Sequence, residues 1–342
     1  MNPTPIPFRK EPLYERTAAR RAAYPLRRSA LAGGLLALML AAGCAGGGQD
    51  GTASPQPSAG APKQAASTLA EEGAPSAEQV LGRAAETMAD TKSLELSMEL
   101  KQDMETDGQT TSMSMTNEGR IIVEPLALMQ KTVNDYMGES STLDSYLTDS
   151  GYYMYDYSNE AWSRMLADEV PKIKATLSDF QIAPAKEIEK IAEHASAFRS
   201  GRENGEQVLL YAGSGSDEAA EALVRDLLRS TMGLDDMEAR VRDSIEVSAL
   251  DYRLRFDEAT GRLIRLEATA DVSIEYDPGN PSRLSQTFTL DYGGWNEAEP
   301  VVVPEEAKDA PEVMPADQGL LDALGEEGLE ELEGLQEQPA AP

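Results

Sequence analysis

The sequence predicts an α+β protein built on one strongly curved antiparallel β-sheet, a half-barrel with a few helices on its concave side. Apolar and polar residues alternate with a period of two over several long segments, the longest at 264–276. This alternation is typical of strands with one dry and one wet face. Turn-forming residues separate the segments. Helical stripes are few and short, so helices can cover only one face, and the sheet is expected to curve around them.

A short helix is expected where the folded part begins. Ser76 and Gln79 form a capping-box pattern, in which each side chain bonds the other residue's backbone N–H. Apolar residues then follow at helical spacing on one face. The helix is expected to end near Asp90.

Two long strands are expected next. Residues 94–101 and 113–123 alternate, and Asp107-Gly108 between them is a strong hairpin signal. Glu124-Pro125 ends the second strand. Shorter strands are expected near 126–128, 143–147 and 152–155, with Trp162 soon after.

Helices interrupt the sheet in the middle of the chain. Pro171 and Pro184 stand where helices can start, since proline suits the first helical turn. A strand is expected at 207–211. The clearest helical stripe runs through residues 216–228, and Gly233 is expected to end it.

The last third of the chain returns to strands. The apolar positions change parity between Val247 and the alternating residues 250–256, which predicts a bulge near Ser248. One parity then holds through 264–276, where Ile264 is the first inward residue of a very long strand. The final strand is expected at 284–292.

The only cysteine, Cys44, ends an apolar run that follows Arg27 and Arg28. The run has the length of a signal-peptide core and is too short to span a bilayer. Small residues precede the cysteine, and the pattern resembles the lipobox of bacterial lipoproteins. This resemblance implies a signal peptide at 1–43 and a mature N-terminal Cys44 that carries diacylglycerol with palmitate-type chains. An ordinary cleaved signal peptide and a short membrane anchor are the alternatives.

The remaining residues divide into three parts. Residues 44–75 are rich in Gly, Pro, Ser and Ala and predict a disordered tether. Residues 76–304 are the expected folded domain. Residues 305–342 carry twelve acidic groups and one basic group, which predicts a disordered solvating tail. A partner-docking acidic helix is the alternative for this tail.

Charge excludes some classes of partner. The chain total of −30 includes +5 from residues 1–43, so the remainder carries −35. Such a surface repels nucleic acid and anionic lipid headgroups, and membrane contact is expected through the acyl anchor alone. Because no cysteine follows Cys44, disulfides and cysteine-based zinc sites are excluded.

No arrangement of residues predicts catalysis or a cofactor. His194 is the only histidine and is expected on a solvated surface, without a matched nucleophile. No calcium-binding loop motif of the EF-hand type is present. Methionines cluster in the first half of the sheet, where they suit an apolar interior. A Cu(I)-carrying role for their thioethers is the less favoured interpretation.

The chain resembles the LolA-like superfamily, including LppX-like half-barrels, and looks closest to uncharacterised lipoproteins of Gram-positive bacteria. The resemblance lies in the order of segments: the helix at 76–90 running into the strand at 94–100, the strand at 152–155 with Trp162, the turn and strand at 257–266, and the ending from Trp295 to Pro304.

This resemblance implies an apolar ligand, such as a lipid, held between the sheet and the helices. The expected lining is Leu96, Met98, Leu100, Met113, Met115 and Ile121. The expectation is therefore a non-enzymatic lipoprotein on the extracytoplasmic face of the cell membrane. The alternative is an envelope interaction or sensing module that contacts another envelope protein and has a solid core.

Overall fold

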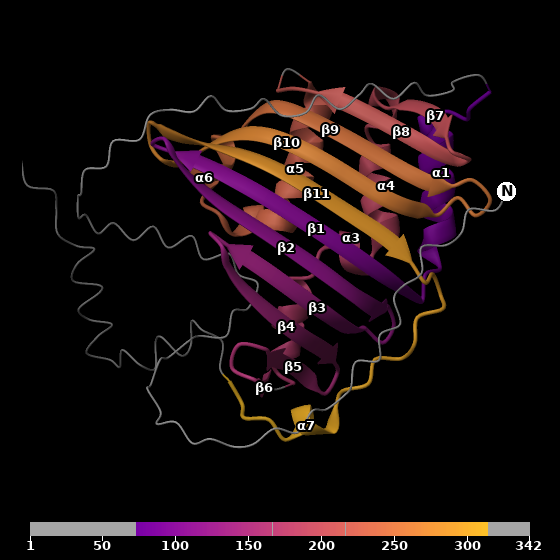
Figure 1. Ribbon diagram of the computed structural model, residues 1–342. Coiled ribbons are helices and arrows are strands. Elements are labelled where there is room, and N and C mark those ends of the chain that lie inside the picture. Colours follow the sequence, from indigo (N-terminus) through magenta and orange to yellow (C-terminus); the bar gives the residue numbers. More distant parts are fainter. Residues whose placement is uncertain (1–72, 166, 216, 314–342) are drawn as a thin grey trace, which may run out of the picture. The chain divides into compact units, whose positions relative to one another are not determined.

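The computed structural model describes residues 73–165, 167–215 and 217–313, and these residues form one antiparallel sheet with helices on one side. The 11 strands follow the order β6-β5-β4-β3-β2-β1-β11-β10-β9-β8-β7 (Figure 1). Their bounds are β1 Ser93–Thr106, β2 Gln109–Ile122, β3 Ala127–Tyr136, β4 Glu139–Thr148, β5 Gly151–Asp156, β6 Ala161–Met165, β7 Arg199–Glu203, β8 Glu206–Gly213, β9 Glu246–Asp257, β10 Leu263–Asp277 and β11 Asn280–Gly293.

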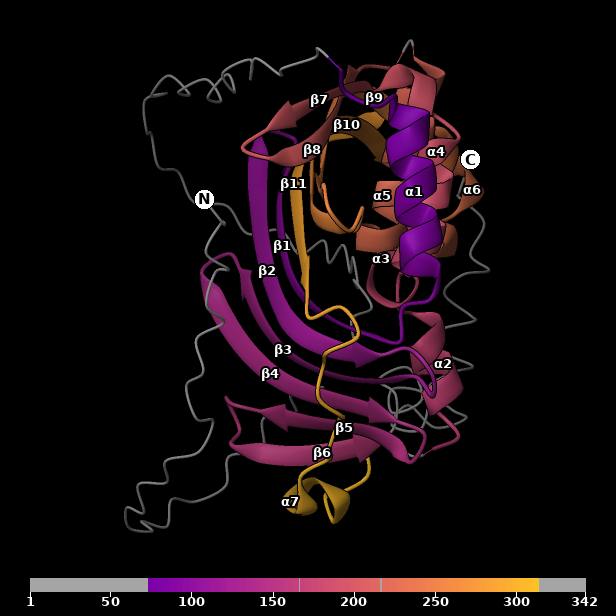
Figure 2. The same ribbon diagram turned by 90° about the vertical axis from the view of Figure 1, so that its right-hand side faces the viewer.

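The helices lie on the concave side of the sheet, except for α7 (Figure 2). Their bounds are α1 Ala77–Ala89, α2 Val170–Ala175, α3 Asp179–Ile182, α4 Pro184–Ala192, α5 Glu218–Met232, α6 Ala239–Asp243 and α7 Glu305–Lys308. Two short 3-10 turns, Ala195–Ala197 and Leu234–Asp236, complete them. The curved sheet is not closed, since β6 and β7 stand at opposite ends of the strand order. The predicted fold class is confirmed.

The helix layer covers the two halves of the sheet unequally. Figures 1 and 2 show α1, α4, α5 and α6 over the half that contains β7 to β11, while α2 lies beside the other half. Helix α5 contacts β8 and β9, α6 contacts β10, and α2 contacts β5. The concave face of β2 to β4 therefore lies away from the main helix layer.

The expected first helix is confirmed in detail. Ser76 and Gln79 form both bonds of the capping box, and the helix ends with Asp90 as its C-cap residue. Arg83 on the exposed side of α1 donates to the carbonyl oxygens of Glu258 and Ala259. The first helix is thus tied to the β9–β10 turn, although 175 residues separate Arg83 from Glu258.

The turn, the bulge and the helix end predicted from the sequence are also present in the structure. Asp107 and Gly108 both have positive φ and join β1 to β2. Ser248 is a bulge, because Ala249 pairs with Asp271 while Val247 pairs with the next residue, Val272. Gly233 ends α5 in the left-handed conformation.

One expected register position is wrong. The pairing of β10 with β9 shifts between Leu263 and Arg265, so Leu263 faces the core and is 2% exposed, whereas Ile264 is half-buried. The irregularity reverses the alternation at the first residue of the strand. Sequence periodicity did not reveal this shift because both residues are apolar.

Strand β7 and helix α6 are among the elements that were not expected from the sequence. Strand β7 contains Gly201 and charged residues and shows no apolar alternation. Helix α6 is five residues long and buries Val241. Both are too short and too polar for a periodic signal, and they form because their neighbours β8 and β10 provide pairing and packing.

The folded part continues beyond residue 304, where the acidic tail was expected to begin. Val303 and Ala307 pack on Tyr153 on the convex side of the sheet. The N–H of Arg164 then donates to the carbonyl oxygen of Pro311, and the N–H of Val313 donates to that of Arg164, at 3.0 and 2.9 Å. Residues 305–313 therefore pack along β5 and β6. The expected signal peptide, Cys44, most of the tether and residues 314–342 lie outside the described residues.

Gly119 of β2 lies directly opposite Gln130 of β3. A Cβ atom at Gly119 would lie 2.7 Å from the carbonyl oxygen of Met129 and 3.0 Å from the Cβ of Gln130. Glycine at this position lets the two backbones approach closely on the concave side.

We expect Gly119→Ala to lower the free energy of unfolding by about 1–3 kcal/mol, because the added methyl group forces β2 away from β3. Gly82→Ala is the matched control. Gly82 lies on the exposed side of α1 with no atom within 4 Å of an added Cβ, so alanine should be neutral or raise stability by up to about 1 kcal/mol. Chemical denaturation measures both. Equal effects of the two substitutions would contradict the close approach.

Candidate functional site: the concave face of the sheet

The six residues predicted to line an apolar site all lie on the concave face of β1 and β2. Strand pairing places Leu100 opposite Met115. Leu96 and Met98 lie on the same face of β1, and Ile121 lies opposite Leu94 at the far end. The structure therefore brings the predicted residues together on one surface.

Their exposure divides these residues into two groups. Leu96, Leu100, Met115 and Ile121 are buried, with at most 7% of each exposed. Met98 and Met113 are half-buried and pack against the core cluster. The buried group belongs to the packed core, while the two methionines offer surface to an incoming molecule.

Apolar side chains gather at the end of the concave face where the β1–β2 and β3–β4 hairpins turn. We call this the open end and define it by Met104, Met113, Tyr136 and Met137. Met113 of β2 lies opposite Tyr136 of β3, and Tyr136 is 56% exposed. Met137 in the following turn is 63% exposed. Exposed large apolar groups at one place mark a binding surface more often than a structural one.

Buried polar residues on this face were not expected from the sequence. The Asn117 amide donates to the Thr132 hydroxyl at 3.1 Å. Next to α5, the Gln102 amide donates to Gln286 Oε1 at 2.7 Å, and the Thr231 hydroxyl donates to the same oxygen at 3.2 Å. Asn117, Gln102 and Gln286 do occupy the inward parity of their strands, which was the signal available in the sequence.

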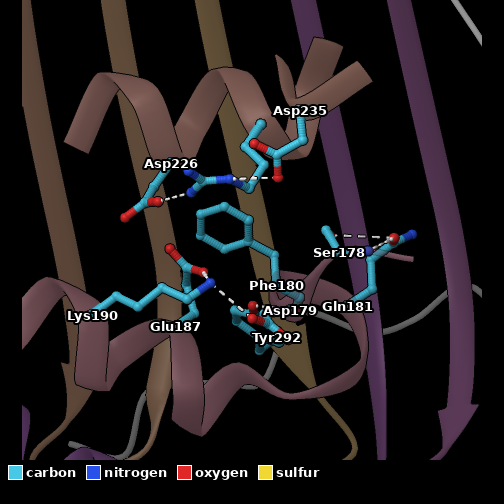
Figure 3. A network of polar contacts seen from close by, with 10 residues as sticks. Ser178, Asp179, Phe180, Gln181, Glu187, Lys190, Asp226, Asp235 and Tyr292 are labelled. Atoms are coloured by element: carbon cyan, nitrogen blue, oxygen red, sulfur yellow. Dashed lines mark hydrogen bonds and ion pairs between the residues drawn. The ribbon is translucent and has the colours of Figure 1, made fainter. Parts of the chain in front are cut away.

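A charged network lies in the helix layer over the other half of the sheet (Figure 3). Lys190 of α4 forms ion pairs with Asp179 of α3 at 2.7 Å and with Glu187 of α4 at 3.3 Å. Tyr292 of β11 donates its hydroxyl to the carbonyl oxygen of Phe180 at 2.6 Å. These contacts fix α3 and α4 against the sheet.

Glu187 is the most buried carboxylate of this network, with 4% of its side chain exposed. Burial raises its pKa to about 7, against the opposing pull of Lys190 and with help from the nearby Asp226 of α5. Burial also raises the pKa of Tyr252 and Tyr292 in the sheet below, and the charge of Glu187 adds to both shifts. The interior here therefore disfavours added negative charge.

The convex face carries a polar groove of about 570 Å³ near the same hairpin ends. It is lined by Asp103, Glu105, Thr110, Ser248, Asp271, Val272, Arg283, Leu284 and Ser285. None of the predicted lining residues belongs to it.

The described residues contain little that suggests bond-making chemistry. His194 is half-buried beside the Ala195–Ala197 turn. Within residues 73–313, apart from 166 and 216, no three histidine, cysteine or acidic residues are grouped to hold a metal ion. Over the same ranges, each helix is too short or too polar to cross a bilayer.

The chain belongs to a family of unknown function, DUF6612, whose model matches residues 76–312. The match begins at the capping residue of α1 and ends at the segment that pairs with β6. No curated protein sequence matches the chain.

Solved structures with a similar arrangement include two mycobacterial proteins. The lipoprotein LppX of Mycobacterium tuberculosis is 13% identical with a TM-score of 0.33, and the match covers 67% of this chain and 98% of that one. LprF of Mycobacterium bovis is 11% identical with a TM-score of 0.33, covering 69% and 100%. A LolA superfamily protein of Nitrosomonas europaea is 9% identical with a TM-score of 0.17, covering 68% and 97%. Likeness at this level assigns no ligand, partner or activity to the chain.

Stability is expected to fall as pH rises from 5 to 7.5, because the folded state holds a proton on Glu187 that the unfolded state, with an ordinary value of 4.5, has released. The groups that face Glu187 are Lys190, Asp179, Asp226, Tyr252 and Tyr292. Glu187→Gln should remove a slope of up to about 1.4 kcal/mol per pH unit. Denaturation midpoints across this range measure it.

Glu189→Gln is the matched control, since Glu189 lies on the exposed side of the same helix. It should keep the slope of the unsubstituted protein. If both variants keep the slope, another group is responsible for it.

Proposed function

We propose that the protein is a non-enzymatic, membrane-anchored lipoprotein of the extracytoplasmic face that binds a lipid or another apolar ligand on the concave face of its sheet. The observation that carries the proposal is the open end. There, Met104 and Met113 are half-buried and Tyr136 and Met137 are exposed, beside the packed residues of β1 and β2. Methionine adapts its shape to varied apolar partners, which suits a binding surface.

The uneven helix cover supports the same proposal. Over β7 to β11 the helices fill the concave face, and Leu209 and Leu254 are 0% exposed. Over β2 to β4 the inward residues Leu128 and Leu147 are buried, whereas toward the hairpin turns Met113 is half-buried and Tyr136 is exposed. A ligand would enter at the open end and lie along this second half, with Met98 and Met113 as its first contacts.

Anchoring is proposed from the sequence. The lipobox pattern at Cys44 supplies the thiol that would carry diacylglycerol, and two acyl chains hold a protein stably at a bilayer where one does not. The tether at 44–75 would separate the folded domain from the lipid surface. The resemblance to lipoproteins of Gram-positive bacteria also stays a prediction.

Envelope interaction remains the second candidate, and a cluster of aromatic residues on the convex face favours it. Tyr155 lies 5.2 Å from Trp162 and 5.0 Å from Tyr157, measured between ring centroids. Tyr157 is 41% exposed, and the Lys131 ammonium lies 5.0 Å from its ring. Aromatic residues are enriched in protein interfaces relative to the rest of the surface.

Binding of the neutral dye N-phenyl-1-naphthylamine tests the first candidate. We expect saturable fluorescence enhancement that long-chain lipids reverse. Met113→Gln should raise the apparent Kd for the dye about tenfold, a change of about 1.4 kcal/mol, because it places an amide at the open end. Met129→Gln is the control on the opposite face of β3, and it should leave dye binding unchanged. Failure of the unsubstituted protein to bind the dye would favour the interaction module.

Replacement of Cys44 by serine tests the anchor. In cells that produce the full chain, we expect Cys44→Ser to move the protein from the membrane fraction to the soluble or secreted fraction, because a hydroxyl cannot receive the diacylglyceryl group. Metabolic labelling with a palmitate analogue should mark the unsubstituted chain and not the variant. Membrane retention and labelling of the variant would refute the lipobox interpretation.

A further inference from the structure

One buried side chain on the proposed binding face has an unused hydrogen-bonding atom. Asn117 of β2 is 2% exposed and faces the concave side. Its Nδ2 donates to Thr132 Oγ1. Its Oδ1 is buried and accepts no hydrogen bond from the described residues. Buried acceptors of this kind nearly always have a partner, because an unpaired one forfeits its hydration without return.

The neighbours of Asn117 are mainly apolar. Strand pairing places Met98 of β1 on one side, and Thr132 of β3 on the other, with Leu143 of β4 beyond it. Met98 and Leu143 are half-buried and pack against the core. The unpaired oxygen thus lies among the side chains proposed to contact an apolar ligand.

Asn117 also lies on the route inward from the open end. Met113 and Asn117 face the same side of β2, four residues apart, which corresponds to about 14 Å along an antiparallel strand. A ligand that enters beside Met113 would pass over Met115 and reach Asn117 with its leading part.

The second unpaired amide of the concave face differs in its surroundings. Gln286 Nε2 is buried without a partner, but the Gln286 side chain also bonds Gln102 and Thr231 of α5. Helix α5 packs over that half of the sheet, so Gln286 lies beneath the helix layer. Asn117 has no such helix partner among the described residues.

We propose that Asn117 Oδ1 accepts a hydrogen bond from a donor group on the ligand, and that the ligand class is a long-chain amphiphile with a hydroxyl or amide N–H, rather than a plain hydrocarbon or a simple ether. The inference rests on the proposed function and deepens it. The apolar part of the ligand would contact Met98, Met113 and Leu143. Its donor group would satisfy the buried Asn117 Oδ1.

The test compares two ligands that share a chain and an oxygen atom and differ in the group on that oxygen, a hydrogen or a methyl group. 1-Dodecanol and its methyl ether have the same chain and the same oxygen, but the ether cannot donate. Each competes with bound N-phenyl-1-naphthylamine on the intact folded protein. We expect the alcohol to displace the dye at about tenfold lower concentration, since one additional hydrogen bond to a buried acceptor is worth roughly this factor.

Asn117→Leu should reduce this preference to about onefold while both ligands still displace the dye. Thr116→Val, on the opposite face of the same strand, is the matched control and should keep the preference. Thr132→Val removes the amide's own partner and should also keep it, because Asn117 Oδ1 stays in place. The comparison of the two ligands on the unsubstituted protein needs no variant to fold.

The outcomes separate the two levels of proposal. Equal displacement by alcohol and ether from the unsubstituted protein would overturn the role of Asn117 and leave apolar binding intact. An alcohol preference that survives in Asn117→Leu would overturn it as well. If neither ligand nor the dye binds, the proposed function and this inference both fall.

Discussion

A sheet with one apolar face must shield that face from water. The extent to which helices pack on it determines the rest of this structure. The inward residues of β9, β10 and β11 are nearly all buried, whereas those of β1, β2 and β3 include half-buried methionines and an exposed tyrosine. Each apolar side chain removed from water contributes roughly 1.5–3 kcal/mol. The helices are too few to cover all 11 strands. Apolar surface stays exposed at the open end, at Tyr136 and Met137, and the proposed ligand would cover it there.

The charged residues that connect the helices to one another include a buried carboxylate, and burying its charge costs free energy. Glu187 lies between α4, α5 and the sheet, and a single cation, Lys190, compensates both it and Asp179. A buried charge with a shared partner is weakly stabilised. The α3–α4 pair is anchored instead by Phe180, which is 1% exposed and packs against Phe288 at 5.4 Å between ring centroids. Apolar packing fixes these helices, and the ion pairs orient them.

The sequence was sufficient wherever local chemistry decides structure. The capping box at Ser76, the turn at Asp107-Gly108 and the bulge at Ser248 are each specified by neighbouring residues, and all three are present. Prediction failed where partners distant in sequence decide. Strand β7 exists because β8 pairs with it, and the shift at Ile264 arises from its register with β9.

The candidate site could be predicted only in part, for the same reason. Inward parity was enough to place Leu96 and Met113 on one face. It could not show that helices cover one half of the sheet and leave the other, since that depends on the tertiary path of α2 to α6. Nor could it distinguish Asn117, whose amide lacks a second partner, from Gln286, which α5 meets. Whether a buried polar atom has a hydrogen-bond partner depends on the tertiary fold.

The short pairing of residues 311–313 with β6 has a consequence for the behaviour of the protein among its own copies. An outermost strand offers its peptide groups to any other extended chain. Here Pro311 and Val313 form hydrogen bonds with the backbone groups of Arg164. An ion pair between Arg164 and Glu312 at 2.8 Å also holds this segment against β6. Anchored to a membrane as proposed, neighbouring molecules would face one another with such edges. The segment after β11 covers the β6 edge at Arg164, where it blocks the addition of a strand from a neighbouring molecule.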